Sequence, residues 1–293
     1  MKKIVIFGVG LIGGSVALAL KKAQANSSSL HIIGLGRNPS SLASAVRLGV
    51  IDACLDSRDD LQSTLADADV ILIAAPVAQT AGILARIKPH LNAQTVVTDA
   101  GSTKSDVLDC AEKILDEQFD QFVGGHPIAG AEKSGVGAAK VDLFVGKNVV
   151  LTPTASTQAQ ALARVTQFWQ SCGAKVSQMS AQAHDSIFAS VSHLPHLLAF
   201  ALVDEIAARP NAAELFGFAA SGFRDFTRIA GSHPEMWRDI SLANKDALLK
   251  ELAAYQNELF TLKTLLENED GEGLQALFSR ASVARNAWSD GKH

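Results

Sequence analysis

Residues 3–15 read KIVIFGVGLIGGS and decide the fold of the chain. The first five of them form an apolar run that is typical of a strand buried on both faces. Gly8, Gly10 and Gly13 follow at the spacing G-x-G-x-x-G, and residues 15–22 continue as a predicted helix. In such a turn the first glycine allows a sharp bend, the second lets the backbone approach a pyrophosphate, and the third lets helix and strand pack closely. The stretch therefore predicts a dinucleotide-binding unit.

The turn supplies the candidate cofactor-binding groups, because the N–H groups and the dipole at a helix start attract phosphate. A glycine turn without a ligand is one alternative. A secretory signal is another, since Lys2 and Lys3 precede the apolar run, but the glycines would weaken its helix, and Lys21 and Lys22 stand before the cleavage site. The cofactor-binding candidates in the turn are Gly8, Gly10, Leu11, Ile12 and Gly13.

Arg37 follows the second predicted strand, residues 30–35. An NAD-specific fold has an acidic residue here, about 20 residues beyond the glycines, to hold the ribose 2′-hydroxyl. In this chain the nearest acid downstream is Asp52. A guanidinium matches a 2′-phosphate, and the missing carboxylate removes a repulsion. We therefore expect NADP in preference to NAD; an ordinary surface arginine and mixed cofactor use are the alternatives.

Strand and helix patterns alternate through the first half of the chain, which predicts an α/β fold with a Rossmann-type doubly wound parallel sheet. From residue 179 onward only helices are predicted. We therefore assign residues 1–173 to a dinucleotide-binding domain and residues 174–293 to an all-helical domain. A leucine stripe in the predicted helix 243–268 fits either a domain core or a dimer interface. Further predicted strands are 69–75, 95–98, 121–124, 149–152 and 175–177.

Composition excludes several classes of protein. The 293 residues are 47% hydrophobic and 19% charged, which is enough apolar material for packed cores and too little charge for disorder. The formal net charge of −4 disfavours a nucleic-acid binder. The three cysteines lie far apart and form no CxxC or disulfide pattern, which is typical of a reducing compartment. We expect a cytoplasmic protein that binds neither nucleic acid nor membrane.

Two polar motifs follow strands of the predicted sheet, at the edge where ligands of such sheets bind. Ser102, in DAGSTK, follows the strand 95–98, and His126, in GGHPIAG, follows the strand 121–124. If these strands are neighbours, a hydroxyl and an imidazole face the nicotinamide together. Imidazole is the usual general base near neutral pH, because its unperturbed pKa is about 6.5. A helix N-cap for Ser102 and backbone hydrogen bonds for His126 are the structural alternatives.

The helical half holds a second set of polar residues. His193 and His196, in SHLPH, indicate a metal only weakly because no third ligand is visible, so we expect no metal. Arg224 and Arg228 lie four residues apart and therefore on one helical face. Such pairs are usually solvated. The glycines and aromatic residues around this pair favour a partly buried anion site, since arginine binds carboxylate through two N–H groups.

Taken together, these motifs resemble the prephenate/arogenate dehydrogenase family of tyrosine biosynthesis over nearly the whole chain. The resemblance implies oxidative decarboxylation of a cyclohexadienol, either prephenate to 4-hydroxyphenylpyruvate or arogenate to tyrosine, with hydride transfer to the nicotinamide. It rests on GVGLIGGS (8–15), DAGSTK (99–104), GGHPIAGAEKSG (124–135), LFVGKNVVLTP (143–153), SHLPH (192–196) and FRDFTRIAGSHPEMWRDI (223–240).

The resemblance also implies roles for single residues. His126 would accept the proton of the ring 4-hydroxyl, and Ser102 would hydrogen-bond the same hydroxyl. Arg228 would bind a substrate carboxylate, His196 would line the same pocket, and Arg224 is a further substrate-binding candidate. The helical domain, residues 174–293, would bind the substrate and form a homodimer. NAD-preferring members carry an acid where this chain has an arginine, and we expect no separate regulatory domain.

Two other functions fit part of the pattern. An NADP-dependent β-hydroxyacid dehydrogenase or imine reductase has the same two-domain plan, but it normally depends on a lysine of the helical domain; Lys245 and Lys250 are the candidates. A nucleotide-sensing module would bind the cofactor without catalysis. The sequence also leaves open the choice between the pyruvyl side chain of prephenate and the alanyl side chain of arogenate.

Overall fold

The computed structural model describes residues 1–25, 30–56, 61–131 and 133–291. Residues 1–245 form one compact unit, and residues 246–293 form a second. The first unit contains an eight-stranded sheet and the helices that follow it, and the second consists of a helical hairpin. The predicted domain boundary between residues 173 and 174 stays a prediction; the last strand of the sheet extends to Gln178.

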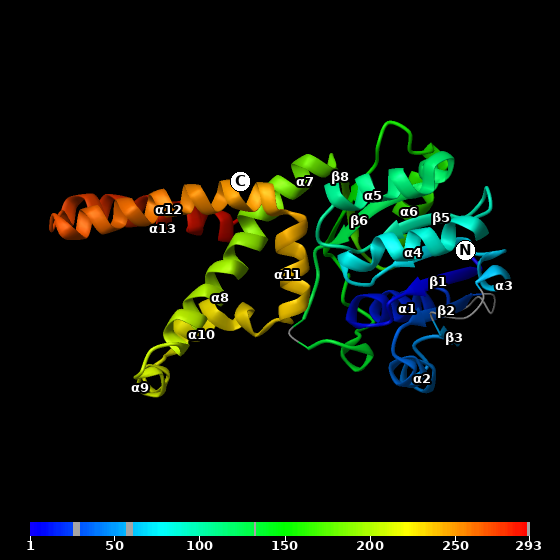
Figure 1. Ribbon diagram of the computed structural model, residues 1–293, viewed down its shortest axis with the longest axis horizontal. Coiled ribbons are helices and arrows are strands. Elements are labelled where there is room, and N and C mark those ends of the chain that lie inside the picture. Colours follow the sequence, from blue (N-terminus) through cyan, green and yellow to red (C-terminus); the bar gives the residue numbers. More distant parts are fainter. Residues whose placement is uncertain (26–29, 57–60, 132, 292–293) are drawn as a thin grey trace. The chain divides into compact units, whose positions relative to one another are not determined.

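The sheet of the first unit has the strand order β3-β2-β1-β4-β5-β6-β7-β8. Its first six strands in this order are parallel to their neighbours, β7 is antiparallel to β6, and β8 is parallel to β7 (Figure 1). The strands are β1 (Lys3–Phe7), β2 (His31–Gly36), β3 (Ala53–Asp56), β4 (Val70–Ile73), β5 (Val96–Asp99), β6 (Phe122–Pro127), β7 (Asn148–Thr152) and β8 (Lys175–Gln178).

The predicted fold class is confirmed, with two corrections to the sheet. The predicted parallel arrangement does not hold for the pairing of β6 with β7, which is antiparallel. Parallel neighbours need a long crossover, usually a helix, whereas the described part of the connection from β6 to β7 contains only the 3₁₀ turn Val136–Ala138. The chain therefore returns antiparallel. The strand β3 was not predicted; it has four residues, lies at the sheet edge and pairs with β2.

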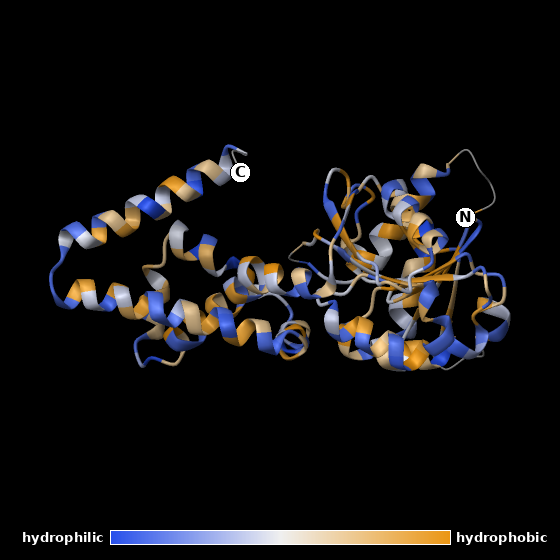
Figure 2. Ribbon diagram, turned by 90° about the horizontal axis from the view of Figure 1, so that it is seen from above, coloured by the Kyte–Doolittle hydropathy of each residue, from blue (hydrophilic) through white to orange (hydrophobic). Residues whose placement is uncertain are grey.

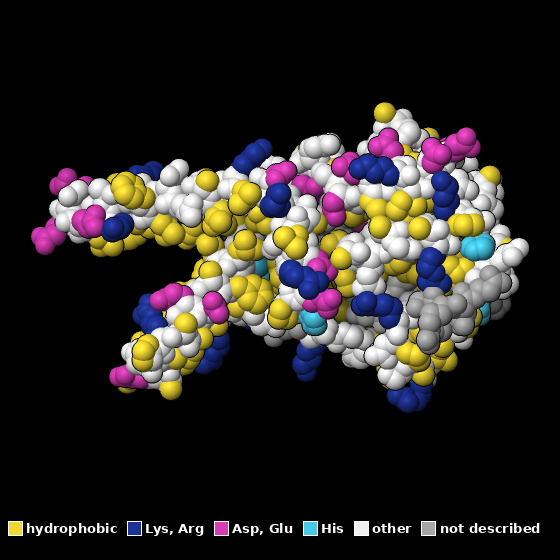
Figure 3. Space-filling view, viewed as in Figure 1, with side chains coloured by type: hydrophobic (Ala, Val, Ile, Leu, Met, Phe, Trp, Pro, Cys, Tyr) yellow, Lys and Arg dark blue, Asp and Glu magenta, His cyan; other side chains and the backbone are white. Residues whose placement is uncertain are grey.

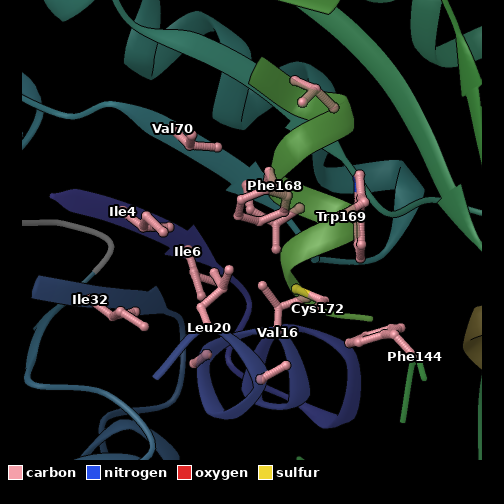
Figure 4. Close-up of a cluster of buried hydrophobic side chains, with 14 of the residues drawn as sticks. Ile4, Ile6, Val16, Leu20, Ile32, Val70, Phe144, Phe168, Trp169 and Cys172 are labelled. Carbon is pink, nitrogen blue, oxygen red and sulfur yellow. The ribbon is translucent and has the colours of Figure 1, made fainter. Parts of the chain in front are cut away.

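Helices cover both faces of the sheet, because the strands alternate their side chains between two cores. In β1, Ile4 and Ile6 point into one cluster together with residues of α1 and α6 (Figure 4). Val5 and Phe7 point into the other cluster, with residues of α4 and α5. Figure 2 shows the mostly hydrophobic strands between the helical layers. The helices of this part are α1 (Leu11–Ala23), α2 (Pro39–Arg47), α3 (Gln62–Leu65), α4 (Thr80–Ile87), α5 (Ser105–Leu115) and α6 (Ala159–Ser171).

A long helical run follows the sheet and carries the SHLPH motif. It consists of α7 (Ala181–Phe188), a π-helical turn (Ala189–His193) and α8 (Leu194–Ala207). Pro195 explains the wide turn, since proline lacks an N–H and its ring clashes with the carbonyl four residues earlier. The remaining helices of the first unit are α9 (Ala212–Gly217), α10 (Ser221–Thr227) and α11 (Pro234–Ala243).

Among the described residues, the run Ala181–Ala207 is the one helix long and apolar enough to cross a membrane. No membrane partner is expected from the sequence. Length and composition alone are weak evidence for a membrane span, because a core helix of a globular protein passes the same test. The run also carries three buried polar side chains, those of His184, Asp185 and His193, which take part in the contacts described below.

The second unit contains α13 (Gly271–Ser289) and all of α12 (Lys245–Glu267) except its first residue. Large hydrophobic side chains of both helices are exposed, as Figure 3 shows along their surface. The leucine stripe predicted for this segment is divided: Leu248 is buried, whereas Leu259 and Leu266 are 48% and 63% exposed. Other exposed members of this surface are Leu249, Tyr255, Phe260, Phe278, Val283 and Trp288.

Candidate active site

The glycine turn after β1 has the geometry that close approach of a pyrophosphate requires. Gly8 has a φ of +95°, and a Cβ there would lie 2.6 Å from the carbonyl oxygen of Ala74. A Cβ at Gly13 would lie 2.2 Å from the carbonyl oxygen of Gly8, so this glycine allows close packing of α1. Gly10 faces open space and caps α1 without any side-chain hydrogen bond. The first N–H groups of α1 are therefore not covered by a side-chain cap, which fits a bound dinucleotide.

A cavity of about 580 Å³ lies beside this turn. Gly8, Gly10 and Arg37 line it, and the exposed Arg37 stands directly after β2. Arg86, on α4, lines the same cavity, and the sequence analysis missed it because nothing local relates it to Arg37. Three other predicted cofactor-binding residues, Leu11, Ile12 and Gly13, lie in the first turn of α1 and are not among the residues that line the cavity.

A second cavity of about 580 Å³ lies beyond the ends of β5 and β6. Ser102, His126, His196 and Arg228 all line it. The first two come close because β5 and β6 are parallel neighbours, with Thr98 opposite Val123. Ser102 lies in the loop after β5, and His126 lies near the end of β6, at the same sheet edge. Arg224 is exposed on α10 and is not among the lining residues. Other lining residues are Phe188, Val191, Ser192, Met236, Trp237 and Ile240.

His126 is the first member of a buried polar chain. Its Nδ1 lies 2.8 Å from Nε2 of His184, and Nδ1 of His184 lies 2.8 Å from Oδ1 of Asp185. The ring of Phe188 packs against both imidazoles. Burial lowers the pKa of His126 well below its ordinary value, and the neighbouring His184 and Lys104 lower it further. A neutral imidazole is the form that accepts a proton, so the surroundings favour a base.

A buried ion pair lies beneath this site. Nζ of Lys104 donates to Oδ2 of Asp99, and both side chains are almost completely buried. The two carboxylate oxygens also accept hydrogen bonds from the backbone N–H groups of Gly101, at 2.8 Å, and Gly125, at 2.9 Å. Asp99 thus connects the loop of Ser102 to the strand of His126.

The two histidines of SHLPH have different environments. Nδ2 of Asn244 donates to Nδ1 of His193 at 3.1 Å, so the proton of this neutral ring is on Nε2. Nδ1 of His196 donates to the carbonyl of Ser192 at 2.9 Å, and its ring stacks on Trp237 with the centroids 3.6 Å apart. Because Nδ1 of His196 is engaged in this hydrogen bond, Nε2 is the ring nitrogen that remains for a ligand. Among the described residues no group of three metal-ligating side chains occurs.

We expect the free energy of unfolding to fall as the pH is lowered from about 6.5 toward 4. Burial lowers the pKa of His126, His184, His193 and His196 in the folded protein, that of His193 to about 4. The unfolded chain then binds more protons than the folded chain, so acid favours unfolding. Guanidinium unfolding at a series of pH values measures the slope.

The matched variants are His193→Gln, which removes one of these groups, and His233→Gln at an exposed histidine. The first should flatten the dependence on pH and the second should not. An unfolding free energy that is constant between pH 6.5 and 4.5 would contradict this account.

The fold and these cavities define a class of protein. A dinucleotide-binding turn lies on the same sheet edge as a second cavity that contains an imidazole, a hydroxyl and a guanidinium. This is the plan of a nicotinamide-dependent dehydrogenase built from a Rossmann sheet and a helical part.

Comparison with known proteins narrows the class. Residues 16–178 match the family model described as prephenate dehydrogenase, nucleotide-binding domain, and residues 180–280 match that described as prephenate dehydrogenase, dimerization domain. The prephenate dehydrogenase of Bacillus subtilis (strain 168) is 40% identical over 285 residues, which are 97% of this chain and 75% of the relative. The cyclohexadienyl dehydrogenase of Zymomonas mobilis is 34% identical over 288 residues, which are 98% and 96% of the two chains.

Solved structures agree. The prephenate dehydrogenase of A. aeolicus, in complex with hydroxyphenyl propionate and NAD+, has a TM-score of 0.89 and 38% identity, covering 97% of both chains. The arogenate dehydrogenase of Synechocystis has a TM-score of 0.79 and 31% identity, covering 98% of this chain and 99% of that one. The chain therefore belongs to the prephenate/arogenate dehydrogenase family and is an NAD(P)-dependent dehydrogenase.

Proposed function

We propose that the protein catalyses the NADP-dependent oxidative decarboxylation of prephenate, arogenate or both, giving 4-hydroxyphenylpyruvate or tyrosine. The observation that carries the proposal is that Ser102, His126, His196 and Arg228 line one cavity, on the sheet edge that also bears the glycine turn. The relatives described above are named for substrates of this kind.

In this proposal His126 accepts the proton of the ring 4-hydroxyl, and Ser102 hydrogen-bonds the same oxygen and orients it. Gly8, Gly10 and Arg37 would hold NADP, which would supply the acceptor for the hydride of the ring carbon. Arg228 binds a substrate carboxylate, and His196 lines the same pocket. Loss of the ring carboxylate as CO2 makes the ring aromatic, which drives the reaction forward.

Trp237 supports an oxygen-rich ligand in this cavity. Its indole Nε1–H is buried and, in the described part of the structure, has no acceptor, although the ring lines the cavity. A buried donor without a partner costs about 1–3 kcal/mol. A substrate carboxylate or carbonyl oxygen would satisfy it.

The decisive experiment compares kcat/KM for prephenate and arogenate, each with NADP and with NAD, by the absorbance of the reduced nicotinamide. Turnover of at least one substrate supports the proposal and ranks the pair. Absence of turnover with both substrates would contradict the proposal. It would favour one of the two alternatives, a β-hydroxyacid dehydrogenase or a nucleotide-sensing module.

Arg37 is proposed to select NADP by contact with the 2′-phosphate. We expect Arg37→Ala to raise the KM for NADP far more than the KM for NAD, because only NADP carries the 2′-phosphate that the guanidinium would bind. Steady-state kinetics with both cofactors measures the two effects. Arg86→Ala is the matched variant at the second guanidinium of the cavity. Equal effects of Arg37→Ala on both cofactors would contradict the assignment.

We further propose a cytoplasmic homodimer that is joined through the helical part. Two observations support the dimer: the matched family model for residues 180–280 is named a dimerization domain, and α12 and α13 expose large apolar side chains. Light scattering after gel filtration tests the mass in solution; a monomer at micromolar concentration would contradict it.

A further inference from the structure

Behind His126, on the side of its Nδ1, lie two residues of α7 to which the sequence analysis gave no role. His184 is completely buried and Asp185 is 6% exposed. Together with His126 they form one line of hydrogen bonds, with both steps at 2.8 Å. Such a line joins a cavity-lining imidazole to a buried carboxylate.

The carboxylate at the end of this line is held from the other side. Its Oδ1 accepts the backbone N–H of Lys104 and its Oδ2 accepts that of Ser105, both at 2.8 Å. These groups lie at the start of α5, where the helix dipole favours a negative charge. The hydrogen bonds lower the pKa of Asp185 to about 2 although burial opposes this. At neutral pH Asp185 is therefore an acceptor only.

Because the carboxylate of Asp185 can only accept, it determines the position of each hydrogen in the line of hydrogen bonds. Nδ1 of His184 must carry the hydrogen that Asp185 accepts, so Nε2 of the neutral ring has the lone pair. Nδ1 of His126 must then donate to that lone pair. This places the lone pair of His126 on Nε2, the nitrogen that is left to meet a substrate hydroxyl.

We infer that His184 and Asp185 are positioning residues that hold His126 in the tautomer able to act as a base. The inference rests on the proposed function, because it concerns the same proton. When the substrate O–H bond breaks, a new N–H bond forms at Nε2 of His126. The Nδ1 proton of His126 can then pass to Nε2 of His184, whose own Nδ1–H still faces the carboxylate.

Other charged groups near His126 are consistent with this arrangement. Lys104 and His193 disfavour a positive charge on His126, whereas Asp185 favours it. Lys104 is paired with Asp99, which limits its effect. The resting imidazole thus stays neutral, while the carboxylate of Asp185 stabilises the charge that develops during the reaction.

The test uses Asp185→Asn in the full chain. The amide can donate to Nδ1 of His184, which would move the hydrogens along the line and put one on Nε2 of His126. We expect kcat to fall by about 10²–10⁴-fold, as expected when a base has the wrong tautomer, while NADPH affinity, measured by fluorescence, stays within about threefold. The pH profile of kcat should also change. The matched control is Asp106→Asn, in the first turn of α5, which should change kcat less than about threefold.

Two variants of His184 keep the test decisive if Asp185→Asn folds poorly. His184→Phe removes the acceptor for His126 Nδ1–H, whereas His184→Gln retains an amide oxygen that can replace it. We therefore expect His184→Phe to lose more kcat than His184→Gln, with thermal unfolding and NADPH binding measured for both. Wild-type kcat within threefold in all three variants, with an unchanged pH profile, would overturn the inference. Failure of the wild type to turn over either substrate would instead contradict the proposed function.

Discussion

Replacement of His126 by asparagine should lower kcat by about 10²–10⁴-fold, the usual cost of losing a general base. Asparagine retains a polar side chain of similar reach but has no basic nitrogen at neutral pH. The KM for NADP should remain within about threefold, because His126 lines the second cavity and is not among the residues that line the nucleotide cavity. Steady-state kinetics with a saturating cofactor separates the two effects.

The pH profile gives this prediction a second measurement. Burial keeps the pKa of His126 well below its ordinary value, so wild-type kcat should be constant through neutral pH and decline only in acid, where the imidazole gains a proton. The residual activity of His126→Asn should lack that decline. Ser102→Ala is the companion variant and should cost less, since it removes only an orienting hydrogen bond. Equal kcat in wild type and His126→Asn would contradict the role of the base.

Replacement of Lys104 by methionine should lower the free energy of unfolding by about 3–5 kcal/mol, the cost of removing one partner of a buried ion pair. Methionine fills similar space but leaves the carboxylate of Asp99 without its cation. The two backbone N–H groups on that carboxylate do not supply a full charge. Guanidinium unfolding of both proteins measures the difference.

Two further variants test the cause of that loss. In the double variant Asp99→Asn, Lys104→Met the charge is absent, so part of the stability should return. Arg209→Met breaks an exposed pair with Glu205 and should change stability by less than about 1 kcal/mol. A Lys104→Met protein as stable as wild type would contradict the assigned importance of the buried pair.

The parts of the fold with strong local patterns could be predicted from the sequence. The glycine turn is one example, because the spacing of its glycines reflects sterics within thirteen residues. The antiparallel direction of β7 could not be predicted in this way. It depends on how the chain returns after β6, and no residue of β7 itself encodes direction. β3 was missed because four residues at a sheet edge give too short a pattern.

The candidate site divides in the same way. Ser102 and His126 were found because each belongs to a motif that follows a predicted strand, and the structure places both in one cavity. Their proposed roles stay predictions. His184 was missed because its contact with His126 joins positions 58 residues apart. One signal was present: a histidine followed by an aspartate within a long apolar helical run is costly to bury without a purpose.

The carboxylate of Asp185 has a consequence for exchanging parts between relatives. It belongs to α7, yet it accepts the backbone N–H groups at the start of α5, which begins three residues after Ser102. Because the donors are backbone N–H groups, the contact depends on the path of the loop 99–105 and not on its side chains. A chimera that took its helical half from one enzyme and its sheet from another would keep the contact only if its α7 carried a carboxylate at this position and its loop followed the same path.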